Sequence, residues 1–305
     1  MNIAALDLGT NSFLCLIAEV LADGSLKVLK DESVVVRLGQ GLQSGGRIQE
    51  EALKRADECL TSFKALMEQF NVQKIQAVAT AAAREAQNAS DFMAIVQKHQ
   101  IPVRTLSGKQ EAEMSYKGAV SPTEASRCLL IDIGGGSTEY IVGSQRRIYL
   151  SQSLPYGAVK LTEKFISIQP VLSRDELLLR QFIIKNSEMT WRSFEKEKPE
   201  KILAVAGTPT ALVASILGKF DSSQIDGYYL DVNTLTKWID KFRTTSVAEK
   251  NQKYNLGARS DIIFAGTVIL EETLKRFGLG GFFVSTKGIR YGLAYELADS
   301  VSTSD

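Results

Sequence analysis

One pattern of chemically useful residues, Asp-x-Gly-x-x-Ser, occurs twice, within LDLGTNS at 6–12 and within IDIGGGS at 131–137. The residues shared by the two copies are Asp7, Gly9 and Ser12 in the first and Asp132, Gly134 and Ser137 in the second. Glycine lets such a turn approach a ligand closely, and successive N–H groups can bind phosphate oxygens. The aspartate can hold a hydrated Mg²⁺ or orient a water molecule. A single copy favours an ordinary hairpin turn, but the repeat predicts a phosphate gripped from both sides in a cleft between two domains.

The segments that must position these turns follow the same order in both halves. Each turn lies between hydrophobic runs that predict strands, and a third strand, a helix, a strand and another helix follow. The first half contains strands at 3–8, 13–20, 26–38, 74–80 and 102–106, and helices from Arg47, Asp91 and Lys109. The second half contains the strands CLLIDI, TEYIVG, RRIYLSQS, ILAVAG and GFFVS, and helices at TEKF, about 174–197, TPTALVASIL, RSDIIFAGTVILEETLKRFG and GIRYGLAYELA. We therefore predict a duplicated fold with domains at 1–124 and 125–305, in which the last helix can pack back on the first domain.

The composition is that of an ordinary globular chain. It has 305 residues, 44% of them hydrophobic, and a formal net charge of +1. This charge provides no global field for nucleic acid, so an anionic ligand must be held by local groups. Cys15, Cys59 and Cys128 lie in apolar runs, and we expect buried reduced thiols. The start of the chain is not leader-like, and no apolar run approaches about 18 residues, so we expect a cytoplasmic protein without a membrane partner.

Further motifs follow one another over nearly the whole chain. They are DLGTNS, AVATAAAREAQN, LSGKQEAEMSYKG, IDIGGGSTE, LPYGAVKLTE, VAGTPTALV, RSDIIFAG and STKGIRYGL. This series resembles the exopolyphosphatase/guanosine pentaphosphate phosphohydrolase (Ppx/GppA) family, within the acetate kinase, sugar kinase, Hsp70 and actin superfamily. The resemblance implies an α/β fold of two actin-like (ribonuclease H-like) domains flanking an interdomain cleft. It also implies Mg²⁺-dependent hydrolysis of the terminal phosphate of inorganic polyphosphate or of guanosine pentaphosphate (pppGpp).

The resemblance assigns roles to individual residues. Glu111 is expected to activate the attacking water, which is worth ~10²–10⁴-fold in rate, and Arg84 to bind the terminal phosphate. Taken alone, Glu111 is a first-turn glutamate favoured by the helix dipole, and Arg84 a surface arginine paired with a glutamate. The implied catalytic residues also include Asp132 and Glu139, and the implied metal ligands are Asp7, Asp132 and Glu139. The implied phosphate-binding residues are Gly9, Thr10, Asn11, Ser12, Gly134, Gly135, Gly136, Ser137, Gly207 and Thr208.

Two positions depart from the family pattern. Gln110 and Glu113 stand where the family commonly has an acid and an arginine, which puts substrate affinity or specificity in question. Lys109 or Lys117 could compensate for the anionic Glu113. Asn88 could cap the helix that follows it or position Arg84.

Other charged residues have simpler interpretations. The only histidine, His99, is expected to be structural, and the HD-type helical domain of longer family members is expected to be absent. The cations predicted to hold the rest of a long anion are Lys160, Lys164, Arg259, Lys287 and Arg290.

Three functions remain open on the sequence. The leading one is an exophosphatase that acts on polyphosphate or pppGpp, with no nucleic-acid partner. The departures at Gln110 and Glu113 motivate a weakly catalytic or non-catalytic sensor of guanosine alarmones. An ATP-dependent kinase of the wider superfamily is the third, and the positions of Glu111 and Arg84 argue against it. A homodimer is compatible with the sequence.

Overall fold

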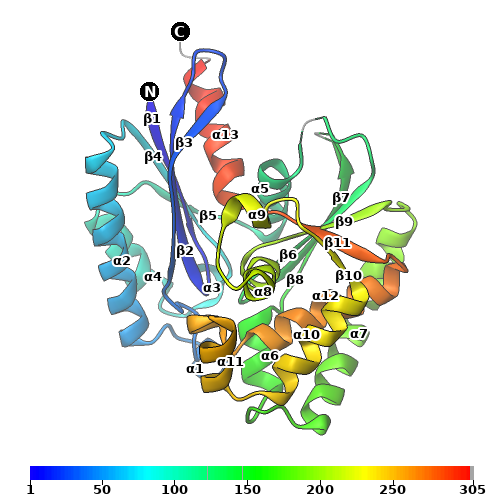
Figure 1. Cartoon of the computed structure of the whole chain (residues 1–305). Helices are drawn as coiled ribbons and strands as arrows, with labels where there is room; N and C mark the ends of the chain where they lie inside the picture. The colour runs from blue at the N-terminus through cyan, green and yellow to red at the C-terminus, as the bar shows by residue number, and fades with distance from the viewer. Residues whose placement is uncertain (122, 146, 303–305) are drawn as a thin grey trace. The chain divides into compact units, whose positions relative to one another are not determined.

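The computed structural model describes residues 1–121, 123–145 and 147–302. It divides into two compact units: unit 1 contains Met1–Ala119 and the residues from Gly288 on, and unit 2 is Val120–Lys287. The division falls after Ala119 rather than at about residue 124, and the last helix belongs to unit 1. In the part of the chain that is described, no helix combines the length and apolar character needed to cross a membrane. Each unit is a β-sheet with helices packed against it (Figure 1).

Unit 1 is built on a five-stranded sheet in the order β3-β2-β1-β4-β5. Its strands are β1 (Asn2–Leu8), β2 (Ser12–Val20), β3 (Leu26–Val35), β4 (Lys74–Ala79) and β5 (Val103–Thr105). Its helices are α1 (Leu42–Gly45), α2 (Glu50–Gln69), α3 (Ala81–Glu85), α4 (Ala89–Lys98), α5 (Gly108–Ala119) and α13 (Ile289–Ser302). The first three strands are antiparallel, whereas β4 and β5 run parallel to β1.

Unit 2 repeats this arrangement in the order β8-β7-β6-β9-β11, with β10 added at the edge. Its strands are β6 (Cys128–Ile133), β7 (Thr138–Ser144), β8 (Arg147–Leu154), β9 (Lys201–Val205), β10 (Tyr229–Asp231) and β11 (Gly281–Val284). Its helices are α6 (Ala158–Phe165), α7 (Ser173–Glu195), α8 (Gly207–Leu217), α9 (Ser222–Ile225), α10 (Val232–Thr244), α11 (Val247–Tyr254) and α12 (Ile263–Phe277), with a 3-10 turn at Gly257–Arg259. Arg146, the first residue of the predicted strand RRIYLSQS, lies outside the described residues.

Alternation along β1 places apolar side chains on both faces of the first sheet. Ala4 and Leu6 pack in one cluster with α2, whereas Ile3 and Ala5 pack in another with α13. Because successive side chains of a strand point to opposite faces, a strand buried on both faces must be apolar throughout. The hydrophobic run that precedes Asp7 is therefore a central strand, and it delivers the aspartate at its carboxyl end.

The helix α13 approaches α5 through glycines. A Cβ atom on Gly118 would lie 2.0 Å from the carbonyl oxygen of Gly288, and one on Gly292 would lie 2.0 Å from that of Met114. Real Cβ atoms never approach so closely, so only glycine fits at these two positions. This contact attaches the returning chain to unit 1 at the point where it leaves unit 2.

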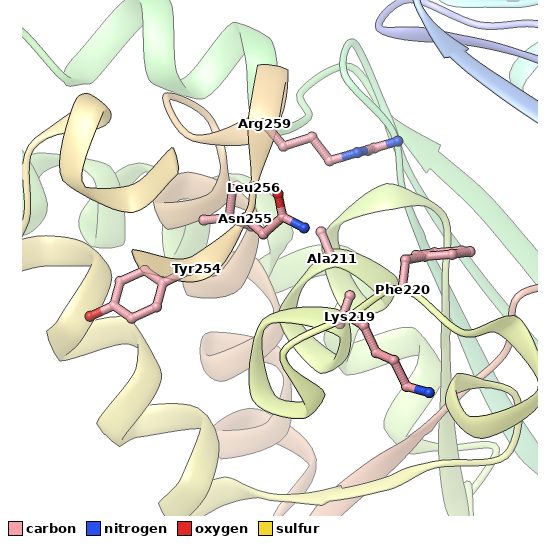
Figure 2. Close-up of a pocket in the computed structure, with 8 residues that line it drawn as sticks. Ala211, Lys219, Phe220, Tyr254, Asn255, Leu256 and Arg259 are labelled. Atoms are coloured by element: carbon pink, nitrogen blue, oxygen red, sulfur yellow. The ribbon is translucent and has the colours of Figure 1, made fainter. Parts of the chain in front are cut away.

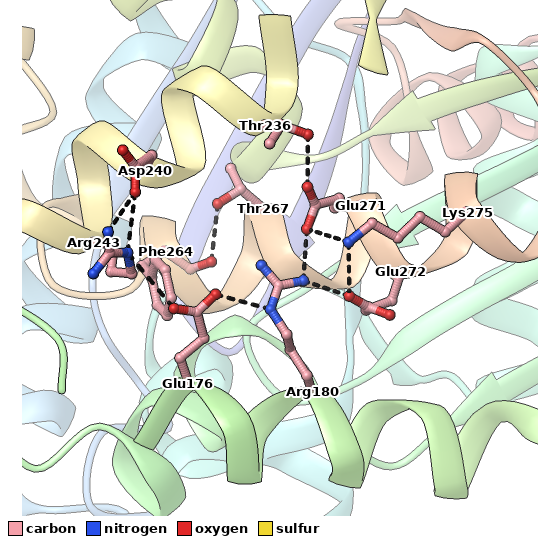
Figure 3. A network of polar contacts seen from close by, with 10 residues as sticks. All are labelled: Glu176, Arg180, Thr236, Asp240, Arg243, Phe264, Thr267, Glu271, Glu272 and Lys275. Atoms are coloured by element: carbon pink, nitrogen blue, oxygen red, sulfur yellow. Dashed lines mark hydrogen bonds and ion pairs between the residues drawn. The ribbon is translucent and has the colours of Figure 1, made fainter. Parts of the chain in front are cut away.

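A network of charged groups joins three helices of unit 2 (Figure 3). Arg180 on α7 donates to Glu271 at 2.5 Å and also to Glu272, both of which lie on α12 and are buried. Thr236 on α10 donates to the second oxygen of Glu271 at 2.7 Å. The helix α12 is buried at every position from Ile263 to Leu274, so its two carboxylates need these partners.

Candidate active site

The two Asp-x-Gly-x-x-Ser turns have the same geometry. The N–H of Gly9 donates to the carbonyl of Ser12 at 3.1 Å, and the N–H of Gly134 donates to the carbonyl of Ser137 at 3.0 Å. The duplicated sequence pattern thus corresponds to a duplicated closed turn at the end of the first strand of each unit.

The turn of unit 2 presents consecutive backbone donors. Gly135, Gly136 and Ser137 are buried, and among the described residues no backbone or side-chain group accepts a hydrogen bond from their N–H groups. Buried donors of this kind are rarely left without a partner, and successive N–H groups of a turn form an anion-binding concavity. The turn is suited to oxygens of a bound phosphate.

Two carboxylates lie beside this turn. Asp132 on β6 is paired directly with Glu139 on β7, so both side chains lie on the same face of the sheet, and both are buried. Ser153 on β8 donates to Glu139 at 2.7 Å. In unit 1 the corresponding pair is Asp7 with Leu14, so only unit 2 carries an acidic pair at this position.

The acidic pair fits a hard divalent cation. In the described residues, no three His, Cys, Asp or Glu side chains lie close enough together to hold a metal ion by themselves. Mg²⁺ usually takes only one or two carboxylates and completes its shell with water and substrate phosphates. Asp132 and Glu139 match that number of ligands, and they lie next to the turn that is predicted to bind phosphate.

The predicted catalytic pair of unit 1 forms an ion pair. Nη1 of Arg84 lies 2.6 Å from Oε2 of Glu111 and also donates to the carbonyl of Leu106 at 2.7 Å. Glu111 is 5% exposed, so its charge is largely removed from water. The glutamate that pairs with Arg84 is the predicted general base, and the arginine fixes where one of its oxygens lies.

The two departures from the family pattern have local partners. Gln110 accepts hydrogen bonds from the N–H and hydroxyl of Ser107 at 2.9 and 3.0 Å, and the Gln110 N–H donates back to that hydroxyl. This is a capping box at the start of α5, in which glutamine serves as well as glutamate. Glu113 lies 3.9 Å from Lys109 on the exposed face of the helix. Lys109 is thus the neighbour that offsets the extra negative charge.

Asn88 and His99 hold the scaffold of unit 1. Asn88 accepts from the N–H of Ile48 at 2.8 Å and donates to the carbonyl of Ile48 at 3.1 Å, which anchors the entry to α2. His99 lies 2.6 Å from a carboxylate oxygen of Asp57. Hydrogen bonds from Lys98 and His99 lower the pKa of Asp57. His99 is therefore structural, as the sequence predicted.

The three cysteines are buried free thiols. Burial raises the pKa of Cys15, Cys59 and Cys128 to about 12. The thiolate is the reactive form of cysteine, so these side chains are not nucleophiles at neutral pH.

The start of α8 contains Gly207 and Thr208, which were also predicted to bind phosphate. A Cβ atom on Gly207 would lie 1.5 Å from Nη1 of Arg259, so the guanidinium rests directly on the glycine. Burial lowers the pKa of Arg259 to about 10, which leaves the side chain charged at neutral pH. A cation at a helix N-terminus adds to the positive end of the helix dipole, and an anion bound here would interact favourably with both. Thr208 is buried against Gly266 of α12.

The five cations predicted to hold the rest of a long anion have different surroundings. Lys160 is only 8% exposed, and Arg290 belongs to unit 1, where it binds both carboxylate oxygens of Asp31 at 2.7 Å. Lys287 lies 3.5 Å from Asp226, and Lys164 lies 4.3 Å from the centre of the Phe182 ring. Lys160 and Arg290 thus belong to different units, and the assignment of the five cations to a long anion stays a prediction.

A hollow of about 120 Å³ lies between α8 and the segment that follows α11 (Figure 2). Its lining comprises Ala211, Ala214, Lys219, Phe220, Tyr254, Asn255, Leu256 and Arg259. Apart from Arg259, these residues were missed by the sequence analysis. The available signal was an aromatic residue directly after Gly218 and Lys219, and Phe220 is indeed 65% exposed.

Known proteins resemble this chain over most of its length. Residues 16–301 match the model of the Ppx/GppA phosphatase family. Exopolyphosphatase 2 of Mycobacterium tuberculosis is 30% identical over 97% of this chain and 98% of its own length. A putative exopolyphosphatase of Haemophilus influenzae is 27% identical over 100% of this chain and 94% of its own.

Solved structures match over the same length. An exopolyphosphatase from Cytophaga hutchinsonii has a TM-score of 0.91 and 25% identity, covering 98% of both chains. The Aquifex aeolicus member of the Ppx/GppA family has a TM-score of 0.78 and 29% identity, covering 100% of this chain and 99% of its own. The predicted α/β fold of two actin-like domains is confirmed. The chain belongs to the Ppx/GppA phosphatase family, whose members are hydrolases.

Proposed function

We propose that this protein is a Mg²⁺-dependent exophosphatase that removes the terminal phosphate from inorganic polyphosphate, from pppGpp, or from both. The observation that carries the proposal is the buried ion pair of Arg84 and Glu111. It provides a positioned base and a phosphate-binding cation in the unit that also carries the first glycine turn. The names of the relatives support polyphosphate as the substrate class.

In the proposed reaction, Glu111 accepts a proton from water as the water oxygen attacks the terminal phosphorus. The bond to the bridging oxygen breaks, and the shortened chain leaves with the electron pair. In unit 1, Arg84 offsets negative charge on the phosphoryl oxygens, and in unit 2 the N–H groups of Gly135 and Gly136 are donors suited to phosphate oxygens. Such donors are most effective when they are fixed before the reaction begins. The binding of one phosphate by the turns of both units remains a prediction.

Asp132 and Glu139 are the residues that would hold Mg²⁺. When bound, the ion would neutralise phosphate oxygens and orient the terminal group. In the first turn, which belongs to unit 1, Asp7 would hold a water molecule and Ser12 would bind phosphate oxygens.

A phosphate-release assay tests this function. The substrates are long polyphosphate, short polyphosphate, pppGpp and ATP, each with and without Mg²⁺. The expected result is Mg²⁺-dependent release of inorganic phosphate from polyphosphate or pppGpp. An absence of release from both, with the folded state verified, would refute the proposed activity.

The second candidate is an alarmone-binding sensor with weak or no catalysis, and the hollow beside α8 favours it. Phe220 offers an exposed aromatic face for a base, and Lys219 and Arg259 offer cations for its phosphates. A sensor of this kind binds pppGpp more tightly than tripolyphosphate but releases little or no phosphate from either. Binding measured by calorimetry, together with the phosphate-release assay, separates the two functions.

A further inference from the structure

The first turn of α6 binds the glycine turn of unit 2 through backbone groups. The N–H of Ala158 lies 2.9 Å from the carbonyl oxygen of Gly134. The N–H groups of Val159 and Lys160 lie 3.0 and 3.2 Å from the carbonyl oxygen of Gly135. The donors at the start of this helix are thus occupied by the protein itself, and two carbonyls of the turn are fixed.

Unit 1 repeats this contact with a segment that is not helical. The N–H of Gly39 lies 2.9 Å from the carbonyl oxygen of Thr10. The N–H groups of Val36 and Arg37 lie 3.0 and 2.8 Å from the carbonyl oxygen of Asn11. In both units, the residues after the third strand therefore bind two successive carbonyls of the glycine turn.

Fixing a carbonyl also fixes the direction of an N–H group. The C=O and N–H of one trans peptide are coplanar and point in opposite directions. The N–H groups of Gly135 and Gly136 must therefore point away from α6. By the same geometry, the N–H groups of Asn11 and Ser12 point away from the segment 36–39.

The fit between each segment and its turn leaves no room for a side chain. A Cβ atom on Gly157 would lie 2.4 Å from the carbonyl oxygen of Gly134, and one on Gly39 would lie 2.3 Å from Cγ2 of Thr10. Thr138 donates to the carbonyl of Tyr156 at 2.8 Å, which secures the residue before Gly157. Each segment therefore lies in direct backbone contact with the turn that it supports.

We infer that the segments 36–39 and 157–160 are positioning elements for phosphate binding, an inference that rests on the proposed function. The turn of unit 2 can rotate its peptide groups at little cost, because Gly134, Gly135 and Gly136 have no Cβ to oppose the rotation. After such a rotation, carbonyl oxygens would face the phosphate and repel it. By binding those carbonyls, the two segments keep the N–H groups directed toward the ligand before it arrives.

Two variants of unit 2 test the inference. Gly157→Ala places a methyl group against the turn. Ala158→Pro removes the donor to Gly134 at the first position of the helix, where proline is tolerated, and the extended Gly157 (φ −150°, ψ −173°) suits a residue before proline. Both variants should raise KM for polyphosphate about ten- to hundredfold, the effect of losing one or two hydrogen bonds to a charged group. The control Gly280→Ala, whose Cβ would meet its nearest neighbour at an ordinary 3.8 Å, should leave KM unchanged.

Binding of inorganic pyrophosphate provides a readout besides activity. In the wild-type protein, pyrophosphate should shift the amide NMR signals of Gly135 and Gly136. In both variants these shifts should need about ten- to hundredfold more pyrophosphate. Gly157→Ala should also unfold at a lower temperature than Gly280→Ala, because its Cβ would meet backbone atoms of the turn. A merely structural role would lower the unfolding midpoint without changing the affinity of the folded protein.

The outcomes are distinguishable. Wild-type KM and wild-type pyrophosphate affinity in a folded Gly157→Ala or Ala158→Pro protein would overturn the positioning role. If only one of the two variants folds, its KM and its affinity for pyrophosphate decide whether the positioning role holds. If the wild-type protein binds pyrophosphate through Gly135 and Gly136, the variants bind it weakly, and no substrate releases phosphate, the positioning role stands and the proposed activity fails.

Discussion

At the scale of single residues, the ion pair of Arg84 and Glu111 determines what each group can do. Removing one partner of a buried pair leaves the other charge uncompensated, so a large side-chain deletion confuses stability with chemistry. An isosteric change avoids this problem. Glutamine at position 111 keeps the shape and still offers an oxygen to Arg84, but it cannot take a proton from water at neutral pH.

We predict that Glu111→Gln lowers kcat for phosphate release by ~10²–10⁴-fold, with a smaller change in KM. Initial rates with polyphosphate at several concentrations measure both constants. The matched control is Glu113→Gln, which removes an exposed carboxylate from the same helix and should retain kcat. Full turnover by Glu111→Gln would assign water activation to another group.

Ala206 stores backbone strain immediately before Gly207. Its φ of 73° and ψ of −165° belong to a region that is essentially restricted to glycine and costs about 1–3 kcal/mol. We predict that Ala206→Gly raises the free energy of unfolding by about 1 kcal/mol, since the relieved strain exceeds the added entropy of the unfolded chain. Denaturant unfolding measures the change. The control Ala211→Gly, inside α8, should instead lower the free energy of unfolding by about 0.5–1 kcal/mol. An equal decrease in Ala206→Gly would show that Ala206 is not strained.

At the scale of elements, the sequence predicted the strands and the glycine turns better than the segments that pack against them. The strands that carry Asp7 and Asp132 are apolar throughout, so both turns could be placed. The strand predicted to reach residue 38 ends at Val35, because residues 36–39 turn to bind the first glycine turn. The region of α10 and α11 received no prediction, although the capping box of Ser246 and Glu249 marks the start of α11. The hollow was missed because its lining comes from two separate segments, 211–220 and 254–259, which only the folded chain brings together.

The charged network on α7, α10 and α12 determines how these helices respond to acid. Burial raises the pKa of Glu271, but hydrogen bonds from Thr236, Lys275 and Arg180 outweigh it and leave the pKa below its ordinary value of 4.5. A carboxylate with a lowered pKa stabilises the fold above its ordinary pKa, and this contribution is lost as the pH falls through the lowered value. The wild-type protein should therefore lose stability below pH 4.5.

We predict that Arg180→Met destabilises the protein at pH 7 by about 3–5 kcal/mol, because it leaves two buried carboxylates with too few partners. The loss on acidification should also be smaller than in wild type, since Glu271 loses one of the hydrogen bonds that lower its pKa. Unfolding free energies at pH 7 and below pH 4.5 check both statements. Arg192→Met, which removes an exposed pair with Glu188 on the same helix, is the control and should change stability by less than about 1 kcal/mol. If the free energy of unfolding depended on pH equally in wild type and Arg180→Met, Arg180 would not be a cause of the lowered pKa of Glu271.

At the scale of the whole molecule, the two units have separate hydrophobic cores, so a substitution can destabilise one unit without the other. The glycine contact between α5 and α13 lies entirely within unit 1. We predict that Gly292→Ala destabilises unit 1 by at least about 1–3 kcal/mol, the usual cost of overpacking, without affecting the core of unit 2. Hydrogen exchange should rise in β1 and α5 and stay unchanged in α12. The control Gly45→Ala, an exposed position whose Cβ would meet only Gln49 at 3.8 Å, should leave both units unchanged.

The return of α13 to unit 1 also has a consequence for biosynthesis. Ile3, Ala5, Leu16 and Val78 form one face of the first sheet, and much of its cover is α13, which the ribosome adds only after all of unit 2. Domains generally fold in the order in which they emerge. In this chain the order is reversed. Unit 2 can complete its fold while the first sheet of unit 1 still exposes an apolar face. The earliest part of the chain is therefore the last to become native, and it is the part for which a chaperone would be needed longest.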